Sequence, residues 1–134
     1  MIDVTDLTFE TSVLQRSHEV PVVVDFWAEW CGPCKALTPV LEREVAARAG
    51  KVSLAKIDVD ANPALAQRFE ISGIPAVKAF HNGAVVSEFV GAQPAQVVAE
   101  FLDALIGDAD EQQDELDADE AEEDEDLEPV IEVL

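Results

Sequence analysis

A continuous apolar run that leads directly into a pair of cysteines constrains this 134-residue chain more than any other feature. Residues 22–28 read Val-Val-Val-Asp-Phe-Trp-Ala, which is typical of a β-strand covered on both faces. Burial on both faces implies helices on both sides of a sheet. Residues 30–34 then read Trp-Cys-Gly-Pro-Cys, and residues 33–49 have the composition of a helix. The sequence therefore predicts an α/β fold with a dithiol at a strand-to-helix junction.

The position of the first cysteine predicts how it reacts. At the amino end of a helix, unpaired N–H groups and the helix dipole stabilise negative charge. A thiol with a pKa of about 8.5 is roughly 3% thiolate at pH 7, whereas one lowered to about 7 is roughly half thiolate. We therefore expect Cys31 to be the nucleophile in disulfide exchange and Cys34, one helical turn later, to be the resolving thiol.

Other uses of two cysteines fit the sequence less well. A structural zinc site needs four N or S ligands, and only His18 and His81 accompany the cysteines, far apart in the sequence. A permanent disulfide across this short loop would remove little entropy from the unfolded chain. Two unrelated buried cysteines would not be expected within four residues of each other at such a junction. Redox function is therefore the favoured interpretation.

The remaining patterns predict the order βαβαβαββα, a mixed sheet with helices on both faces. Strands are expected over residues 2–4, 22–27, 52–59, 76–80 and 85–90, the last two joined by an Asn82-Gly83 turn. A first helix is expected after a cap at Thr5 or Asp6, and its apolar residues Leu7, Phe9, Val13 and Leu14 include helical spacings. A second helix is expected over residues 33–49, with a kink at Pro39 and an end at Gly50. Two more are expected, one from Pro63 to about Phe69 and one over residues 94–106 that ends at Gly107.

Charge divides the chain into two parts. All eight basic residues and 14 of the 29 acidic residues lie in 1–106, whereas residues 107–134 carry 15 acidic residues and no basic one. We expect a globular domain over 1–106 and a disordered acidic tail over 107–134. A solubilising tail is the simplest interpretation. The alternatives are steering of a basic partner and attachment through the apolar end, residues 127–134.

Composition also excludes several classes of function. A pI near 4.1 without a basic stripe argues against nucleic-acid binding. The sequence contains no apolar stretch of 18 residues, so we expect no membrane-spanning helix. Residues 1–6 lack the basic and apolar pattern of a secretory signal. The expected location is the cytoplasm, where reduced thiols suit a catalytic pair.

Residues 26–35, Phe-Trp-Ala-Glu-Trp-Cys-Gly-Pro-Cys-Lys, resemble the active-site segment of the thioredoxin family. Further matches in order and spacing are Asp25, Pro39, Lys56, Gly73-Ile74-Pro75, Asn82-Gly83 and Val90-Gly91. The resemblance covers residues 1–106 and implies the thioredoxin fold, an α/β fold whose central mixed sheet of about five strands is flanked by about four helices. Two departures are Ala76, where the family often has threonine, and the acidic tail.

Asp25 stands in the middle of a buried run, where desolvation should raise its pKa. The resemblance implies that Asp25 acts as the base for Cys34, through water, and that Lys56 on the adjacent strand modulates its charge. The alternative is that Asp25 lies at a strand end in solvent and Lys56 is an ordinary surface residue. The Gly32-Pro33 spacer resembles that of reducing family members.

The resemblance also implies a substrate groove beside the cysteines. In family members, a cis peptide bond before the proline corresponding to Pro75 faces the dithiol. The shallow apolar groove is lined by the residues that match Trp30, Gly73, Ile74, Val90 and Gly91. An extended substrate segment pairs with the backbone there.

The function predicted from these features is that of a cytoplasmic, monomeric thioredoxin-type reductase of protein disulfides. A partner of the thioredoxin reductase type would supply its electrons, and no bound metal or organic cofactor is implied. A binding module or co-chaperone that holds clients, with thiol turnover secondary, is the alternative from another class. A thiol oxidase or isomerase is a third possibility, which the redox potential would decide.

Overall fold

The computed structural model describes the backbone of residues 1–122 and the side chains of residues 1–110. Along the chain the elements are β1 (Ile2–Asp3), η1 (Glu10–Gln15, a π-helix), η2 (Arg16–His18, a 3-10 helix), β2 (Val22–Trp27), α1 (Gly32–Ala46), β3 (Ser53–Asp58), α2 (Pro63–Arg68), β4 (Ala76–His81), β5 (Ala84–Val90) and α3 (Ala95–Glu122).

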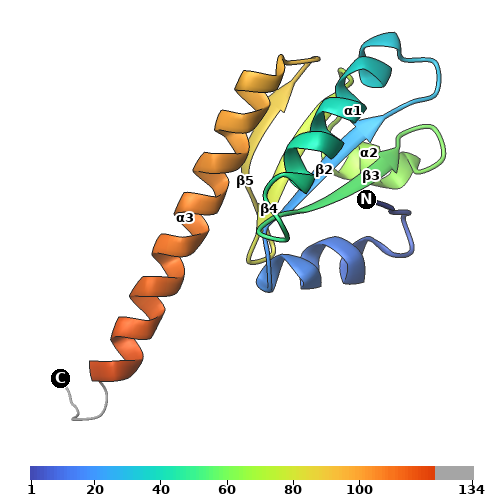
Figure 1. Ribbon diagram of the computed structural model, residues 1–134. Coiled ribbons are helices and arrows are strands. Elements are labelled where there is room, and N and C mark those ends of the chain that lie inside the picture. Colours follow the sequence, from blue (N-terminus) through green and yellow to red (C-terminus); the bar gives the residue numbers. More distant parts are fainter. Residues whose placement is uncertain (123–134) are drawn as a thin grey trace.

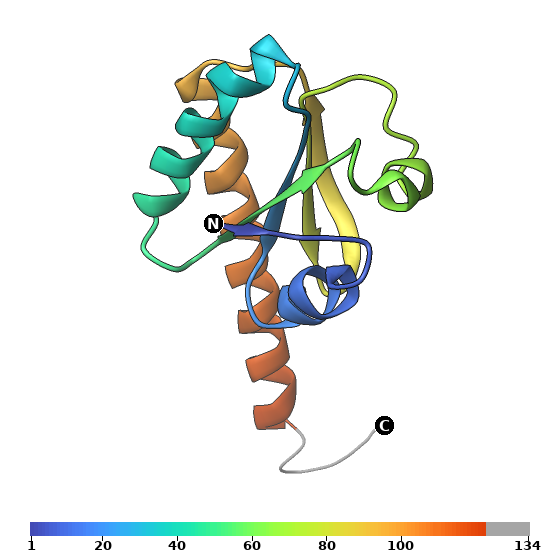
Figure 2. The same cartoon turned by 90° about the vertical axis from the view of Figure 1, so that its right-hand side faces the viewer.

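The strands form one five-stranded mixed sheet in the order β1-β3-β2-β4-β5 (Figure 1). β1, β3 and β2 are parallel, β4 is antiparallel to β2, and β5 is antiparallel to β4. Helices α1 and α3 cover one face of the sheet, and the amino-terminal helical segment and α2 lie on the other (Figure 2). The predicted fold class, a thioredoxin-type mixed sheet with helices on both faces, is confirmed.

Strand β2 lies at the centre of the sheet and explains the continuous apolar run. Residues 22–26 are all buried. Successive side chains of a strand point to opposite faces, so Val22 and Val24 pack with Phe9 on one side, whereas Val23 packs with Leu37 on the side of α1. Asp25 has the same parity as Val23. The acidic residue is therefore directed beneath the helix that begins at the cysteines.

The amino-terminal segment differs from its predicted amphipathic helix. Phe9 and Val13 are buried as expected, but Leu7 is 94% exposed. The helix predicted over 33–49 also ends earlier, at Ala46, and residues 47–50 form turns after it. Pro39 lies inside α1, as predicted. Both differences arise at helix ends, where local hydrogen bonds compete with the apolar pattern.

The end predicted for the last helix at Gly107 is wrong, because α3 continues to Glu122. Glycine lowers helix stability but does not prevent a helix, and the flanking residues include the helix formers alanine, leucine, glutamate and glutamine. Beyond the predicted end, α3 projects past the sheet (Figure 1). Residues 123–134, including the apolar end, lie outside the described residues.

The hairpin between β4 and β5 confirms the predicted Asn-Gly turn. Asn82 and Gly83 have φ values of +54° and +82°, the left-handed values that a tight hairpin turn requires. The backbone N–H of Gly83 donates to Ser17 Oγ at 2.8 Å, which ties the turn to η2. A register shift occurs between Ala79 and Phe80.

Two glycine-to-alanine substitutions are expected to change stability in opposite directions. Gly83→Ala should destabilise the fold by about 1–2 kcal/mol, because alanine is strained at positive φ and its Cβ would lie 3.4 Å from His18 Nε2. Gly107→Ala should stabilise by about 0.5–1 kcal/mol, because it lies inside α3 and nothing within 4 Å would meet its Cβ. Urea unfolding measures both. Destabilisation by Gly107→Ala would contradict a continuous helix.

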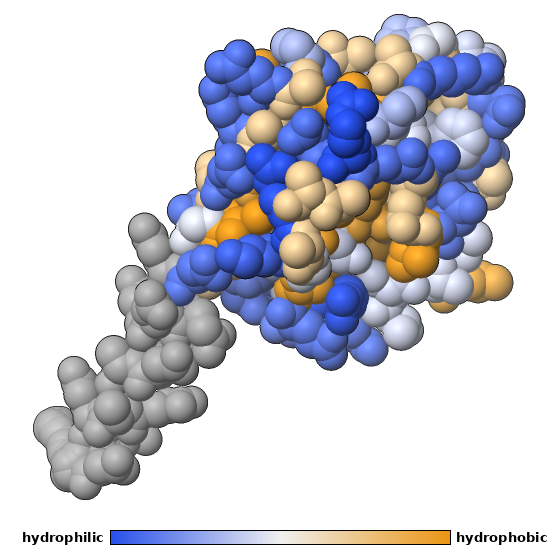
Figure 3. All heavy atoms as spheres, viewed as in Figure 1, coloured by the Kyte–Doolittle hydropathy of each residue, from blue (hydrophilic) through white to orange (hydrophobic). Residues whose placement is uncertain are grey.

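The surface in the orientation of Figure 1 is mainly hydrophilic, with apolar side chains in patches between charged ones (Figure 3). Among the described residues, none of the helices combines the length and the apolar character needed to cross a bilayer.

Candidate active site

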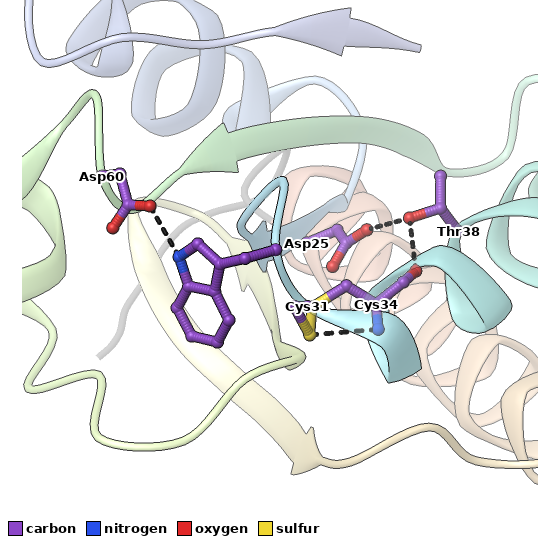
Figure 4. The surroundings of a disulfide bond; sticks show 6 residues. Asp25, Cys31, Cys34, Thr38 and Asp60 are labelled. Carbon is purple, nitrogen blue, oxygen red and sulfur yellow. Dashed lines mark hydrogen bonds between the residues drawn. A yellow bond between two sulfur atoms is a disulfide. The ribbon is translucent and has the colours of Figure 1, made fainter.

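The two cysteines lie where β2 leads into α1, and they form a disulfide. Cys31 is the N-cap of α1, with extended backbone angles of φ −89° and ψ 106°. Its Sγ accepts a hydrogen bond from the backbone N–H of Cys34 at 3.1 Å (Figure 4), and the two Cα atoms are 5.3 Å apart. Pro33 stands in the first turn, where its missing N–H leaves no helix bond unmade. The geometry provides a donor to the sulfur that is predicted to carry charge.

Asp25 lies beneath α1, close to the redox pair, and is 1% exposed. Burial raises its pKa from 3.8 to about 6, against the lowering effects of the Thr38 hydrogen bond and the Lys56 charge, while Glu42 raises it further. Thr38 Oγ1 donates to Asp25 Oδ2 at 3.0 Å. The alternative that Asp25 stands at a solvent-exposed strand end is wrong. The carboxyl group can therefore gain or lose a proton near neutral pH.

Lys56 stands beside Asp25 on the neighbouring strand, in direct register. Its Nζ lies over the Trp27 indole, 4.2 Å from the ring centroid, a cation–π arrangement. The ammonium charge lowers the pKa of Asp25. The structure thus places Lys56 where it can influence Asp25, and Trp27 holds it there.

The loop that precedes β4 lies next to the disulfide and contacts the end of β5. The Ile74–Pro75 peptide bond is cis, as the resemblance implied, and Ile74 packs against the cluster formed by Ala28 and the two cysteines. The backbone N–H of Gly91 donates to the Pro75 carbonyl at 2.8 Å. Gly73 lies next to Val90, since a Cβ built on Gly73 would be 3.8 Å from a Val90 methyl group. Among the residues predicted to line the groove, the structure therefore brings together Gly73, Ile74, Pro75, Val90 and Gly91.

Trp30 is the exposed apolar side chain nearest the cysteines in sequence, with 69% of its surface accessible. Its Nε1–H donates to Asp60 Oδ2 at 2.7 Å (Figure 4). Asp60 is itself held in a turn, because its backbone N–H donates to Asp58 Oδ1 at 2.9 Å. Sequence reasoning did not identify Asp60, which lies 30 residues away from Trp30 in the chain.

Thr38 was also not predicted to belong to the site. It lies four residues after Cys34 in α1, so helical spacing places both residues on one side of the helix. That spacing, together with a buried acid on the preceding strand, is the signal that could have identified it.

Comparison with known proteins identifies the family to which this chain belongs. A family model described as Thioredoxin matches residues 1–104. The chain belongs to the thioredoxin family. It is 52% identical to mitochondrial thioredoxin of Bos taurus over 91 residues, which are 68% of this chain and 55% of that protein. It is 49% identical to thioredoxin of Mycolicibacterium smegmatis over 107 residues, 78% of this chain and 94% of that protein.

Thioredoxin C-2 of Corynebacterium nephridii is 45% identical to the chain over 106 residues, 96% of that protein. The chain thus spans about half the length of the mitochondrial relatives it matches and nearly all of these bacterial ones. The thioredoxin family and the paired cysteines support a thiol-disulfide oxidoreductase over the client-binding alternative.

Thioredoxins need no bound cofactor, because the two cysteines are the redox centre. Within the side chains that the structure describes, no group of three or more His, Cys, Asp or Glu residues could hold a metal ion. The redox group that the structure describes in this thioredoxin domain is the Cys31–Cys34 pair.

Proposed function

We propose that the chain reduces protein disulfides through a dithiol–disulfide cycle of Cys31 and Cys34. The observation that carries this proposal is the position of Cys31 Sγ at the amino end of α1, where it accepts an N–H bond and is joined to Cys34. A helix amino terminus and a backbone donor both stabilise a thiolate. The two Cα atoms are 5.3 Å apart, which is within the range that a disulfide requires.

The proposed reaction proceeds in two steps. The Cys31 thiolate attacks one sulfur of the substrate disulfide, and the other substrate sulfur leaves as a thiolate. Cys34 then loses its proton and attacks Cys31 Sγ, which breaks the mixed disulfide and releases the second substrate thiolate. The substrate has gained two electrons, and the two cysteines have lost them. Because Cys34 is already within bonding distance, the second step is intramolecular and fast.

Asp25 is proposed to accept the proton of Cys34, through water, with Lys56 modulating its charge. The support is its burial beneath α1 and a pKa raised to about 6 by that burial. A carboxylate with this pKa is mostly ionised at pH 7, so it can act as a base. The positive charge of Lys56 favours the ionised form of Asp25 and so lowers the pKa of this carboxyl group.

Trp30, Gly73, Ile74, Pro75, Val90 and Gly91 are proposed to bind the substrate segment around the disulfide. Cys31 is only 3% exposed, so the substrate disulfide must bind close to the Cys31 sulfur before it can react. Trp30, which precedes Cys31 in the sequence, is 69% exposed, and Val90 is 61% exposed. An extended peptide covering these apolar groups would align its disulfide with Cys31.

The assay that tests the function is reduction of insulin disulfides, with electrons supplied by a reductase of the thioredoxin reductase type, our proposed donor. Catalytic turnover that depends on both proteins is the expected result. Equilibration with glutathione buffers separates the reductase from an oxidase or isomerase, because the proposed reductase should have a reduction potential near that of reducing family members. An oxidising potential with no insulin turnover would contradict the proposal.

Asp60→Ala is expected to weaken substrate binding without slowing the thiol chemistry. Removal of the acceptor frees the Trp30 indole, and one exposed hydrogen bond is worth about 1 kcal/mol, so KM for insulin should rise roughly threefold to fivefold. Asp60→Asn keeps an acceptor oxygen and is the matched control. A small-molecule disulfide should be reduced at an unchanged rate. An equal loss with both substrates would contradict a role in binding.

Residues 1–106 are proposed to form the catalytic domain, and residues 107–134 an accessory acidic segment that attracts basic partners. The support is the charge, with 15 acidic and no basic residues in the segment. The chain without residues 108–134 should keep its rate with insulin. Its rate with a basic protein substrate should fall at low salt and match the full chain at high salt, where charges are screened. Equal rates at every ionic strength would exclude steering.

The proposed setting is a reducing compartment such as the cytoplasm, with the protein acting as a monomer. Relatives named as mitochondrial and as bacterial thioredoxins are equally compatible with a reducing environment. Sedimentation of the oxidised and reduced forms measures the oligomeric state.

A further inference from the structure

The Thr38 hydroxyl lies between two acceptors but has only one hydrogen to donate. Its Oγ1 is 3.0 Å from Asp25 Oδ2 and 3.0 Å from the backbone carbonyl oxygen of Cys34 (Figure 4). The second contact is the usual bond from a helical threonine to the carbonyl four residues earlier. The first is not explained by helix geometry, because Asp25 belongs to β2. The hydroxyl therefore links the buried acid to the resolving cysteine.

The two oxygens of Asp25 have different surroundings. Oδ2 faces Thr38, whereas Oδ1 is buried without a hydrogen-bond partner among the described residues. A donor at one oxygen fixes the orientation of the carboxylate and leaves the other oxygen to take up a proton. Charge-assisted hydrogen bonds are stronger than neutral ones, so the hydroxyl should donate to Asp25 while the carboxylate is ionised. Once Asp25 is neutral, the Cys34 carbonyl can compete for the same hydrogen.

We propose that Thr38 is a positioning residue that directs proton transfer from Cys34 to Asp25 during release of the substrate. The proposal rests on the dithiol cycle described above. In the mixed disulfide, the Cys34 proton passes through water to Asp25 Oδ1. The Cys34 thiolate then forms the bond to Cys31 Sγ, and the substrate leaves as a thiolate with the electron pair of the broken S–S bond. Thr38 keeps Oδ2 occupied while the carboxylate is charged, and its hydrogen is free to turn to the Cys34 carbonyl afterwards.

This arrangement affects only the second step of the cycle. The Cys31 thiolate depends on the amino end of α1 and on the Cys34 N–H, neither of which involves the Thr38 hydroxyl. Asp25, in contrast, loses its hydrogen-bond donor when the hydroxyl is removed. The carboxylate is then less stable, so the pKa of Asp25 rises and less of the base is ionised near neutral pH.

A substitution at Thr38 leaves the other groups that face Asp25 unchanged. They are Lys56 on β3, Glu42 on α1, the Cys34 thiol on α1, and the apolar Val77 opposite on β4. Thr38→Val has nearly the same shape as threonine and removes only the hydroxyl. Thr38→Ser restores the hydroxyl and is the matched control.

The experiment measures single-turnover release of a thiol from a preformed mixed disulfide on Cys31, between pH 5 and pH 9. In Thr38→Val the midpoint of the pH profile should move up by about one pH unit, the size expected for one lost hydrogen bond to a charged group. Release should be roughly threefold slower at pH 6.5 and nearly unchanged at pH 8.5. Thr38→Ser should restore the wild-type profile. In an Asp25→Asn background, Thr38→Val should have no further effect.

Several results would overturn the proposal. A pH profile identical to wild type in Thr38→Val would do so, and so would an equal shift in the Asp25→Asn background. Iodoacetamide alkylation of reduced Cys31 should be unchanged, which separates positioning from general damage to the site. If valine prevents folding, Thr38→Ala provides the same test. Absence of thiol release in the wild-type chain would reject the proposed function itself, whereas normal wild-type release without the Thr38 effect rejects this inference alone.

Discussion

Cys31→Ser is expected to abolish disulfide reduction, with a loss of at least about a thousandfold in insulin turnover. Serine keeps the N-cap geometry, but its hydroxyl is not ionised at neutral pH and cannot exchange with a disulfide. The domain should stay folded, because Cys31 is one small residue at the edge of the core. The insulin assay with the reductase measures the loss, and circular dichroism checks the fold.

Cys34→Ser is the control that separates the two thiols. Cys31 should still attack, but the mixed disulfide cannot be resolved, so the substrate stays covalently bound and mass spectrometry detects the adduct. Turnover that persists in Cys31→Ser would contradict the assignment of the nucleophile. Suppression of client aggregation by Cys31→Ser at the wild-type level, together with no insulin reduction by the wild-type chain, would favour the co-chaperone alternative.

Asp25→Asn is expected to stabilise the fold by about 3 kcal/mol at pH 8. Burial raises the pKa of Asp25 from 3.8 to about 6, so the folded state disfavours the carboxylate relative to the unfolded state. Below pH 3.8 both states hold the proton and the charge costs nothing. Between 3.8 and about 6 the folded state keeps a proton that the unfolded state releases, so stability falls as the pH rises. Above about 6 the full cost is present.

Urea unfolding of the oxidised wild type and Asp25→Asn, at pH 4 and pH 8, measures this difference. The variant should be nearly as stable as wild type at the lower pH and clearly more stable at the higher one. A difference that does not change with pH would show that the substitution acts through packing and not through charge. Turnover by Asp25→Asn should be slower than by wild type, because the variant has lost the base. The pH dependence of its rate should lack the midpoint near pH 6.

Much of the fold follows from the sequence because local and long-range signals agree. The run at residues 22–26 is buried on both sides, the Asn82-Gly83 turn joins β4 to β5, and Cys31 begins α1. Helix ends were predicted less well. Gly107 resembled a terminator, yet α3 continues through it, because a glycine lowers helix stability by only about 1 kcal/mol.

The site was predictable where one segment of the chain builds it, and less so where distant segments meet. The cysteines and Asp25 come from consecutive elements, β2 and α1. Asp60 contacts Trp30 across 30 residues, and side-chain hydrogen bonds between loops leave no periodic pattern. Thr38 was overlooked for a different reason: a threonine inside a helix is ordinarily explained by its bond to its own backbone.

The buried carboxyl group under α1 has a consequence for engineering. A library of variants selected only for heat resistance should enrich uncharged residues at position 25, since natural proteins are seldom at their stability optimum. The clones recovered in this way would be robust scaffolds that exchange electrons slowly. An effort to stabilise this domain for use as a reagent therefore has to measure turnover as well as the melting temperature.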